Sequence, residues 1–290
     1  MIRLADYVIK YLKRIGVDVV FTVSGGGSIW LCDALSKKTI NYICCHHEQA
    51  VGYSVEGYSR SKNNVGVGIV TTGPGGTNTI SAVSSCWIDS VPAVFISGQV
   101  FLNQTIQKSK LRQKGVQEIN IIDLVKPNTK FAKTLEDPNE IKKLLDYAFY
   151  QATNGRPGPC WIDIPGNFQN TYIDEKKLKN FYPVKKKISP DLKKISKISD
   201  LLISSKKPIF IFGHGCRLSR SMKIAKKIIQ KMGVPFALTW NASDFLDNNN
   251  KLFIGKPGAF AERGSNFIVQ SADLIIAVGT RLPYMVTGYN

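Results

Sequence analysis

The sequence predicts an α/β protein with a doubly wound parallel sheet, followed by a second, Rossmann-like unit that is incomplete. Two observations predict this fold class. Short apolar segments rich in β-branched and aromatic residues alternate with longer segments of helical character, an order typical of a parallel sheet covered by helices. The chain also has 290 residues, 43% of them hydrophobic, which is enough to fill the cores of two ordinary domains.

A helix is expected at the N-terminus, where five apolar residues fall on one face at helical spacing. They are Leu4, Val8, Tyr11, Leu12 and Ile15. Charged residues interrupt this stretch too often for a secretory signal, and no apolar run of the sequence is long enough to span a membrane. A cytoplasmic protein is therefore expected.

Five apolar segments are expected to be strands that are buried on both faces. They are residues 17–23, 41–45, 65–72, 93–98 and 159–165. Helices are expected between them, at residues 28–38, after Glu48, at 77–90 and at 137–154. Together these elements predict a first domain over residues 1–170.

Residues 166–190 carry proline, lysine and little periodicity, which indicates a linker, and its limits are predicted at 171–190. A second α/β unit is expected over residues 191–290. Its predicted elements are a helix at 191–204, a strand at 208–213, a helix at 219–232 and strands at 234–240 and 272–279. No helix follows the last strand to cover the sheet, so this unit is expected to be incomplete.

The formal net charge of +18 raises the alternative of a nucleic-acid partner. The lysines, however, lie in clusters at linkers and on predicted helix faces, without the interleaved aromatic residues that stack on bases. We expect a solvated basic surface with no nucleic-acid or membrane partner. An anionic substrate would still be attracted to such a surface.

The cysteines do not form the paired motif of a zinc or redox site, because no C-x-x-C occurs. They are Cys32, Cys44, Cys45, Cys86, Cys160 and Cys216. Most have apolar or small neighbours, so we expect reduced residues in the core.

Three glycine-rich turns follow predicted strands, in TVSGGGSIW, TTGPGGTN and FGHGCRLS. Glycine lets a ligand approach the backbone there, and the following helix offers free N–H groups to an anion. The first turn fails the dinucleotide-binding fingerprint, because Trp30 stands where the third glycine is required. No P-loop motif occurs in the sequence.

The stretch HHEQAVGYSVEGYSR, residues 46–60, suggests either a metal site or an acid–base group. Metal binding is disfavoured, because adjacent histidines point apart and Val51 stands where a zinc-binding helix carries its second histidine. A structural role for Glu48 at a helix N-terminus remains an alternative to a chemical one. The roles of His46 and His47 stay open between a cofactor contact and packing.

Four motifs together resemble the pyrimidine-binding domain of thiamine diphosphate enzymes of the acetolactate synthase-like group. They are HHEQAVGYSVEGYSR, GIVTTGPGGTNTISAVSSCWIDSVPAVFISGQV, GVQEINI and ATNGRPGPCWIDIPGNFQ, in matching order and spacing across residues 1–170. The later IFGHGCRLS and SADLIIAVGTRLPYMVTGYN resemble part of that group's central domain. The resemblance therefore covers essentially the whole chain.

The resemblance implies a carboligase or decarboxylase that acts on pyruvate or another 2-keto acid with thiamine diphosphate. In the family, the glutamate that matches Glu48 shares a proton with N1′ of the aminopyrimidine, which favours the tautomer that activates the thiazolium carbon. The resemblance places Gly73, Pro74, Gly75, Gly76 and Asn78 near the pyrimidine and the dimer contact. It places Gly25, Gly26, Gly27, Gln99 and Gln117 on the substrate side, although the glutamines have an alternative role as hydrogen-bonding loop residues. Glu56 is expected to make a structural contact.

Two departures from the acetolactate synthase pattern leave the second substrate open. Val116 replaces the aromatic residue before the matching glutamine, and Val23 and Ser24 replace a Tyr-Pro pair before the first glycines. The segment GKPGAFAERGSNF is closer to relatives from sugar-modifying pathways, which would join an acyl group from pyruvate to a keto sugar.

The Gly-Asp-Gly motif and later asparagine with which the family holds the diphosphate and Mg²⁺ do not occur in the sequence. We therefore expect a fragment whose Mg²⁺ site lies in another domain, with a non-catalytic or regulatory chain that pairs with full-length relatives as the alternative. A homodimer or tetramer is expected. The resemblance also leaves open an FAD site that involves Arg156, Arg263 and residues 255–263, although Arg156 has an alternative role as the anchor of a turn.

Overall fold

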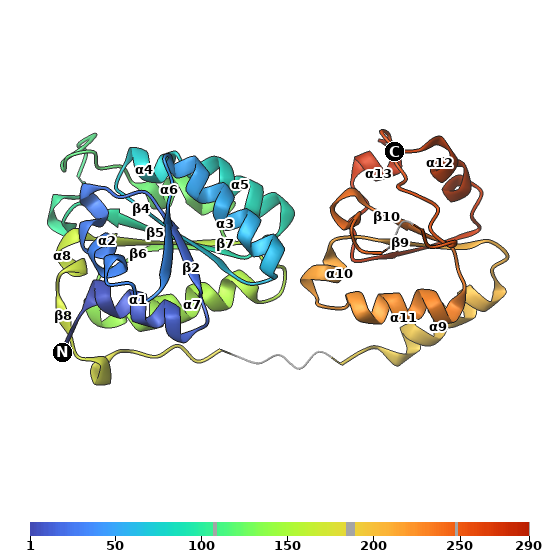
Figure 1. Ribbon diagram of the computed structural model, residues 1–290, viewed down its shortest axis with the longest axis horizontal. Helices are drawn as coiled ribbons and strands as arrows, with labels where there is room; N and C mark the ends of the chain where they lie inside the picture. Colours follow the sequence, from blue (N-terminus) through green and yellow to red (C-terminus); the bar gives the residue numbers. More distant parts are fainter. Residues whose placement is uncertain (107–108, 184–188, 247–248, 290) are drawn as a thin grey trace. The chain divides into compact units, whose positions relative to one another are not determined.

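The computed structural model describes residues 1–106, 109–183, 189–246 and 249–289. The chain divides into two compact units, Met1–Lys185 and Lys186–Asn290, called unit 1 and unit 2 below. Figure 1 shows that each unit has its own sheet and its own helices. No helix of the described residues is long and apolar enough to cross a membrane.

Unit 1 is built on a six-stranded sheet in the order β3-β2-β4-β5-β7-β6, in which every neighbouring pair is parallel. The strands are β2 (Val19–Thr22), β3 (Asn41–Cys44), β4 (Gly66–Val70), β5 (Ala93–Gln99), β6 (Phe131–Thr134) and β7 (Pro159–Pro165). The predicted α/β fold class with a parallel sheet is thereby confirmed.

Helices cover both faces of this sheet, so the fold is doubly wound (Figure 1). One buried cluster joins the sheet to α1 (Leu4–Arg14), α2 (Ile29–Ser36) and α7 (Ile141–Thr153). A second cluster joins the opposite face to α3 (Glu48–Lys62), α5 (Ile80–Asp89) and α6 (Ile121–Val125). The strands between the two clusters are apolar on both sides, which is why they read as continuous apolar runs in the sequence.

Two further strands close unit 1, and neither they nor β6 were predicted. β1 (Ile2–Arg3) pairs in antiparallel fashion with β8 (Tyr172–Ile173). The short helices α8 (Gly166–Gln169) and η5 (Glu175–Lys177) flank β8, so ordered elements occupy the start of the predicted linker. Segments of two to four residues are too short to show periodicity, which is why the sequence did not predict them.

Several predicted positions are wrong in detail. β3 is an edge strand with all four residues exposed, so it is not buried on both faces. Ile15 is 40% exposed because it follows the last turn of α1. Cys44 is exposed and Cys32 and Cys45 are only half-buried, whereas the other three cysteines are buried as expected. All six cysteines are free.

Strand order reverses between β2 and β4, which are neighbours in the sheet although β3 lies between them in the sequence. In open α/β sheets, ligands bind outside the carboxyl ends of the strands at such a switch point. The turn Gly25–Gly27 follows β2 and the turn Gly73–Gly76 follows β4. Glu48 is the first helix residue after β3. The two glycine turns and Glu48 therefore all lie at the carboxyl ends of the strands.

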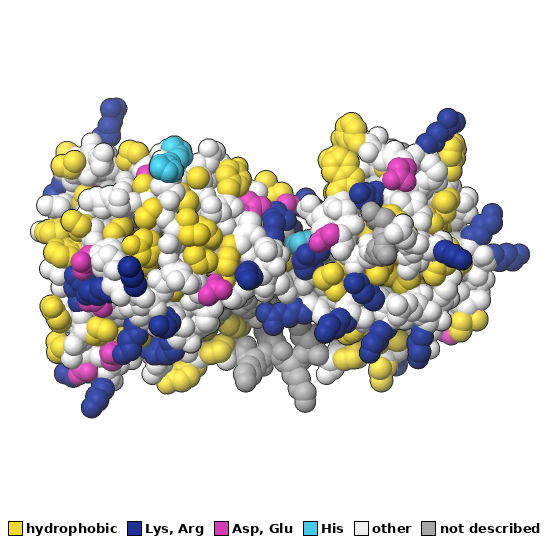
Figure 2. All heavy atoms as spheres, viewed as in Figure 1, with side chains coloured by type: hydrophobic (Ala, Val, Ile, Leu, Met, Phe, Trp, Pro, Cys, Tyr) yellow, Lys and Arg dark blue, Asp and Glu magenta, His cyan; other side chains and the backbone are white. Residues whose placement is uncertain are grey.

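Unit 2 is a three-stranded parallel sheet in the order β10-β9-β11. Its strands are β9 (Pro208–Phe212), β10 (Phe236–Leu238) and β11 (Leu274–Val278), within or close to the predicted segments. Its helices are α9 (Leu192–Ser204), α10 (Gly215–Leu218), α11 (Met222–Met232), α12 (Arg263–Gln270) and α13 (Tyr284–Thr287). The short helix α13 follows β11, so the expectation that no helix follows the last strand is wrong. Stacked phenylalanines form its core, including Phe210, Phe212 and Phe245. Lys and Arg side chains gather over α9 and α11 in Figure 2.

Candidate functional site

The turn after β2 packs directly onto the end of β4. A Cβ atom on Gly27 would lie 1.8 Å from Oγ1 of Thr72, so a side chain cannot be accommodated there without a shift. The backbone N–H of Gly27 donates to Oγ1 of Thr71 at 3.0 Å. Glycine at this position therefore holds the first turn against the second one.

The turn after β4 carries the short helix α4 (Pro74–Thr77), and Gly73 precedes it. Gly73 has φ +60°, and a Cβ atom there would lie 1.9 Å from the carbonyl oxygen of Gln117. Both the backbone conformation and the close approach require glycine. The loop that contains Gln117 is thus seated on the GPGG turn.

Glu48 is the first residue of α3, and its carboxylate faces the GPGG turn. Its Oε2 accepts a hydrogen bond from Nδ2 of Asn78 at 3.0 Å. Its Oε1 lies 3.4 Å from the position that a Cβ atom on Gly75 would occupy. Glu48 is half-buried, and on α3 it is followed by Val51 and Val55, both fully buried. The structure therefore brings Glu48, Gly75 and Asn78 together.

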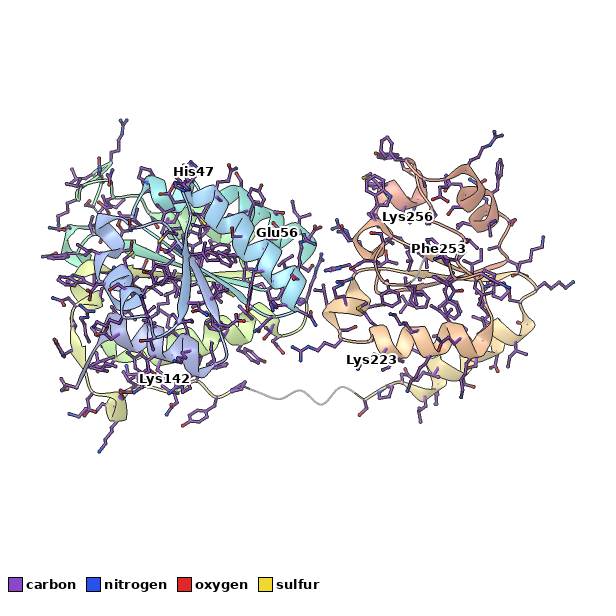
Figure 3. The ribbon with its side chains drawn as sticks, in the orientation of Figure 1. His47, Glu56, Lys142, Lys223, Phe253 and Lys256 are labelled. Atoms are coloured by element: carbon purple, nitrogen blue, oxygen red, sulfur yellow. The ribbon has the colours of Figure 1, made fainter. Side chains whose placement is uncertain are left out.

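The histidines before Glu48 are exposed at the same edge. His47 is the N-cap of α3, and its Nδ1 accepts from the backbone N–H of Gln49 at 3.0 Å. Figure 3 places His47 at the head of α3, and histidine side chains are visible on the surface there in Figure 2. Within the described residues, no group of three or more histidine, cysteine or acidic side chains could hold a metal ion.

Glu56 lies about two turns after Glu48 on α3 and pairs with basic and polar side chains. Its Oε1 accepts from Arg60 at 2.6 Å and from Oγ of Ser85 at 3.1 Å, and Arg60 also pairs with Asp89. Desolvation opposes the charge of Arg60, but its acidic partners raise the guanidinium pKa overall. The expected structural contact of Glu56 is confirmed: it joins α3 to α5.

Gln99 ends β5 and is buried, with both ends of its amide engaged. Its Nε2 donates to the carbonyl of Ile119 and to Oδ2 of Asp163, both at 3.2 Å, while its Oε1 accepts from the N–H of Val100. These bonds are those of a loop-fixing residue, the alternative that the sequence left open for Gln99. Gln117, by contrast, is exposed and has φ 58°.

Asp163 of β7 was not predicted as a notable residue. Its carboxylate accepts from Oγ of Ser97 at 2.6 Å and from Oγ1 of Thr134 at 3.2 Å, in addition to Gln99. Burial raises its pKa to about 6, against the lowering effect of these hydrogen bonds. The signal in the sequence was an aspartate within an otherwise apolar strand.

Arg156 and Arg263 lie in different units. Nε of Arg156 donates to Oγ of Ser90 at 2.6 Å, which supports the alternative role of Arg156 as the anchor of its turn. Arg263 begins α12 and lies over the ring of Phe267 at 5.3 Å. Near it, unit 2 has a pocket of about 340 Å³ lined by Trp240, Ser243, Lys256, Phe260, Ala261 and Glu262.

Two family models match the chain. The thiamine pyrophosphate enzyme N-terminal TPP-binding domain matches residues 2–124, and the central domain of the same family matches residues 195–290. The first matched range lies within unit 1 and the second within unit 2.

Similar curated proteins are large subunits of acetolactate synthase. The subunit from Cyanidium caldarium is 30% identical over 97% of this chain and 48% of its own length. The subunit from Corynebacterium glutamicum is 31% identical over 98% of this chain and 45% of its own, and that from Lactococcus lactis 30% over 96% and 48%. The chain thus spans about half the length of the curated relatives it matches.

Proposed function

Because this chain belongs to the thiamine pyrophosphate enzyme family, with matches to its N-terminal and central domains, we propose that it forms the pyrimidine-binding part of a carboligase or decarboxylase. Its substrate would be a 2-keto acid of the pyruvate type, by analogy with relatives named acetolactate synthase. When bound, thiamine diphosphate supplies the carbon nucleophile and the electron sink that such a reaction needs.

The observation that carries this proposal is the position of the Glu48 carboxylate. It lies at the switch point of the sheet, between Asn78 and the bare backbone of Gly75. A flat heteroaromatic ring can approach a backbone that carries no side chain, and a carboxylate at its edge can share a proton with a ring nitrogen. Val51 and Val55 are buried where α3 packs on the sheet and would keep water from that side of the carboxylate, which strengthens such a hydrogen bond.

The surrounding turns would complete the site. Gly73 to Gly76, with Pro74 among them, and Asn78 would contact the aminopyrimidine. Gly25, Gly26 and Gly27 would line the substrate side, with Gln117 presented beside them. Gln99 would act by fixing the end of β5, because all three of its hydrogen bonds run to protein groups.

The diphosphate and Mg²⁺ would be held by protein outside these 290 residues. The support for this part is the lack of a Gly-Asp-Gly motif in the sequence. Carboxylate and carbonyl oxygens are the ligands that Mg²⁺ requires, and the motif would supply them together with the diphosphate oxygens. The cofactor would therefore join this chain to a second domain or subunit.

The test of the assigned role is the substitution Glu48→Gln, which keeps the shape of the side chain and removes its charge. Pyruvate consumption with thiamine diphosphate and Mg²⁺ is measured on the chain joined to, or mixed with, the diphosphate-binding part. We expect a loss of at least about 100-fold, the scale of a lost proton-transfer partner. Glu136→Gln, which changes an exposed carboxylate, is the matched control.

Full activity in Glu48→Gln would exclude the assigned role. Calorimetry of the 290-residue chain with thiamine diphosphate separates the alternative of a regulatory chain. Binding near micromolar affinity without any added partner contradicts that alternative, and it also contradicts a diphosphate site outside these residues. No binding and no turnover in the reconstituted mixture support the regulatory alternative.

We also propose that two copies associate through α3. Its outer face leaves small and aromatic residues uncovered, among them Ala50, Tyr53 and Gly57. On α5, which covers the same face of the sheet, Trp87 and Ile88 are 41% and 56% exposed. Sedimentation of the purified chain tests this association.

FAD binding is a further part of the proposal and rests on the pocket of unit 2. Trp240 and Phe260, whose ring centroids lie 6.3 Å apart, offer aromatic walls, and Lys256 offers a cation to a phosphate. Arg263 lies close in sequence, whereas Arg156 is already bonded to Ser90. Visible flavin absorbance of the purified protein tests this part, and a colourless protein that takes up no added FAD contradicts it.

A further inference from the structure

The chain leaves the sheet after β5 and reaches the next α-helix, α6, through a long connection, residues 100–120. Its regular structure within the described residues is one short turn, η2 (Leu102–Gln104). Figure 1 shows its described parts beyond α4, in teal. A connection of this length with little regular structure needs some other source of order.

The order comes from Glu118, a carboxylate that is 6% exposed. Its Oε2 accepts from the backbone N–H of Lys114 at 2.9 Å and from that of Gly115 at 3.1 Å, and its Oε1 accepts from the N–H of Ile106. An ionised carboxylate that accepts several backbone N–H groups makes strong, charge-assisted bonds. Glu118 thus ties together two limbs of the loop, twelve and four residues upstream of itself.

Other contacts close the loop around this carboxylate. Nζ of Lys114 donates to the carbonyl of Asn103 at 2.6 Å. A Cβ atom on Gly115 would lie 2.8 Å from a methyl group of Val100 and 3.0 Å from the carbonyl of Gln104, so the limbs are in direct contact there. The described parts of the loop, residues 100–106 and 109–120, are therefore held together by direct contacts, with the carboxylate of Glu118 buried among them.

The residues next to Glu118 reach the candidate site. Gln117 has φ 58°, a conformation that costs a non-glycine residue about 1 kcal/mol, and its carbonyl oxygen is seated on Gly73. The side chain of Val116 is 83% exposed. Gly75, two residues after Gly73 in the same turn, is the residue that the carboxylate of Glu48 approaches. Strained residues persist only where the surrounding structure fixes them. Gln117 is held between Gly73, on which its carbonyl oxygen is seated, and Glu118, the next residue, which is bonded to both limbs of the loop.

We propose that Glu118 is a positioning residue, which holds this loop closed so that Gln117 and Val116 are presented to the 2-keto acid beside Glu48. The inference rests on the proposed function for the identity of the substrate. The anchoring of the loop by Glu118 does not depend on the proposed function. An experiment can therefore contradict the anchoring and the substrate assignment separately.

The first experiment follows hydrogen exchange of loop peptides in the 290-residue chain. In Glu118→Gln, the side-chain NH₂ group replaces one carboxylate oxygen. It would then face backbone N–H donors that this oxygen accepts from in the wild type. We expect the amides of Ile106, Lys114 and Gly115 to exchange about tenfold faster or more, the scale of a lost charge-assisted bond. Peptides from β4 and β5 should be unchanged, which shows that the variant is folded. Glu136→Gln is the control.

Unchanged loop exchange in Glu118→Gln would overturn the inference. Glu118→Asp is the second variant, because it keeps the charge on a shorter side chain, and partial restoration of the slow exchange is expected. If Glu118→Gln fails to fold, the exchange of Glu118→Asp decides alone, and exchange at the wild-type rate in both limbs would then contradict the anchoring.

The second experiment measures turnover of the reconstituted enzyme. We expect Glu118→Gln to raise the KM for pyruvate about tenfold while the concentration of thiamine diphosphate that gives half-activation stays unchanged. A looser loop with an unchanged KM would reduce Glu118 to a structural residue. Absence of turnover in the wild type would contradict the proposed function, and hydrogen exchange would still decide whether Glu118 anchors the loop.

Discussion

Asp163 is a carboxylate surrounded by neutral donors, and its effect on stability can be stated with its sign. Burial raises its pKa in the folded protein to about 6, above its ordinary value. The folded state therefore binds the proton more tightly than the unfolded state does, and stability falls as pH rises from about 4 to about 6. A shift of this size corresponds to roughly 3 kcal/mol, all of it destabilising above pH 6.

Replacing Asp163 by asparagine should remove this pH dependence. We expect the difference in unfolding free energy between wild type and Asp163→Asn to change by roughly 1–1.5 kcal/mol between pH 7 and pH 5, with wild type gaining as pH falls. Urea denaturation at several pH values measures it. Glu136→Gln, whose side chain is 70% exposed, should give no comparable change, and parallel pH profiles for wild type and Asp163→Asn would contradict the assignment.

At the scale of elements, the site depends on turns that approach one another more closely than side chains allow. Gly73 combines φ +60° with the nearby carbonyl of Gln117, whereas Gly57 lies within α3 with no atom within 4 Å of a Cβ position. The same substitution should therefore have opposite effects at the two glycines, because one is required and the other only adds flexibility to a helix.

Gly73→Ala should destabilise the protein by about 2 kcal/mol or more, since it adds backbone strain to a clash with Gln117. Gly57→Ala should stabilise it by roughly 0.5–1 kcal/mol, the helix propensity difference. Thermal unfolding of both variants measures the effects. A neutral Gly73→Ala would show that the loop at Gln117 can move away from the GPGG turn at little cost.

The elements also show what the sequence could predict. Long strands such as β5 and β7, and amphipathic helices such as α1, follow from apolar runs and helical spacing. β6, at four half-buried residues, has no such pattern and forms because its register with β7 is fixed by the rest of the sheet. Tertiary pairing, not local preference, decides these short segments.

The candidate site could be predicted only in part from the sequence. Glu48 and the glycine turns stand out by composition and by position after strands. Glu118 does not, because its partner Ile106 lies on another limb of the loop. Asp163 can be noticed as an aspartate within an apolar strand, but its partner Ser97 lies on another strand and cannot be read from its neighbours along the chain.

For the whole molecule, the main point is the division into two units with separate cores. Unit 1 has buried clusters on both faces of its sheet. In unit 2, α9 has no buried residue within the described structure, although its apolar side chains include Leu192, Ile195 and Ile198, at 74%, 47% and 49% exposed. Exposed apolar surface of this kind is unfavourable in water.

The two units should therefore behave differently when they are produced separately. We expect residues 1–185 to unfold in one cooperative transition, and residues 186–290 to bind a dye that reports exposed apolar surface. Replacing Ile195 and Ile198 by glutamate should reduce dye binding of the second piece without unfolding it. Equal, weak dye binding by both pieces would contradict this expectation, and circular dichroism verifies that each piece is folded.

The antiparallel pair of β1 and β8 has one further consequence. It sets Ile2 beside Ile173, so the first and the last strand of unit 1 lie side by side. The chain after β8 stays packed on the unit through η5, Leu178 and Phe181. Domains whose ends meet tolerate a new order of their segments. Unit 1 could be circularly permuted through a connector that joins the segment after Phe181 to the start of β1, with its new ends in an exposed turn such as that around Gly155, where a Cβ atom would meet no other atom within 4 Å. The chain order of the elements would change while the arrangement around Glu48 stayed the same.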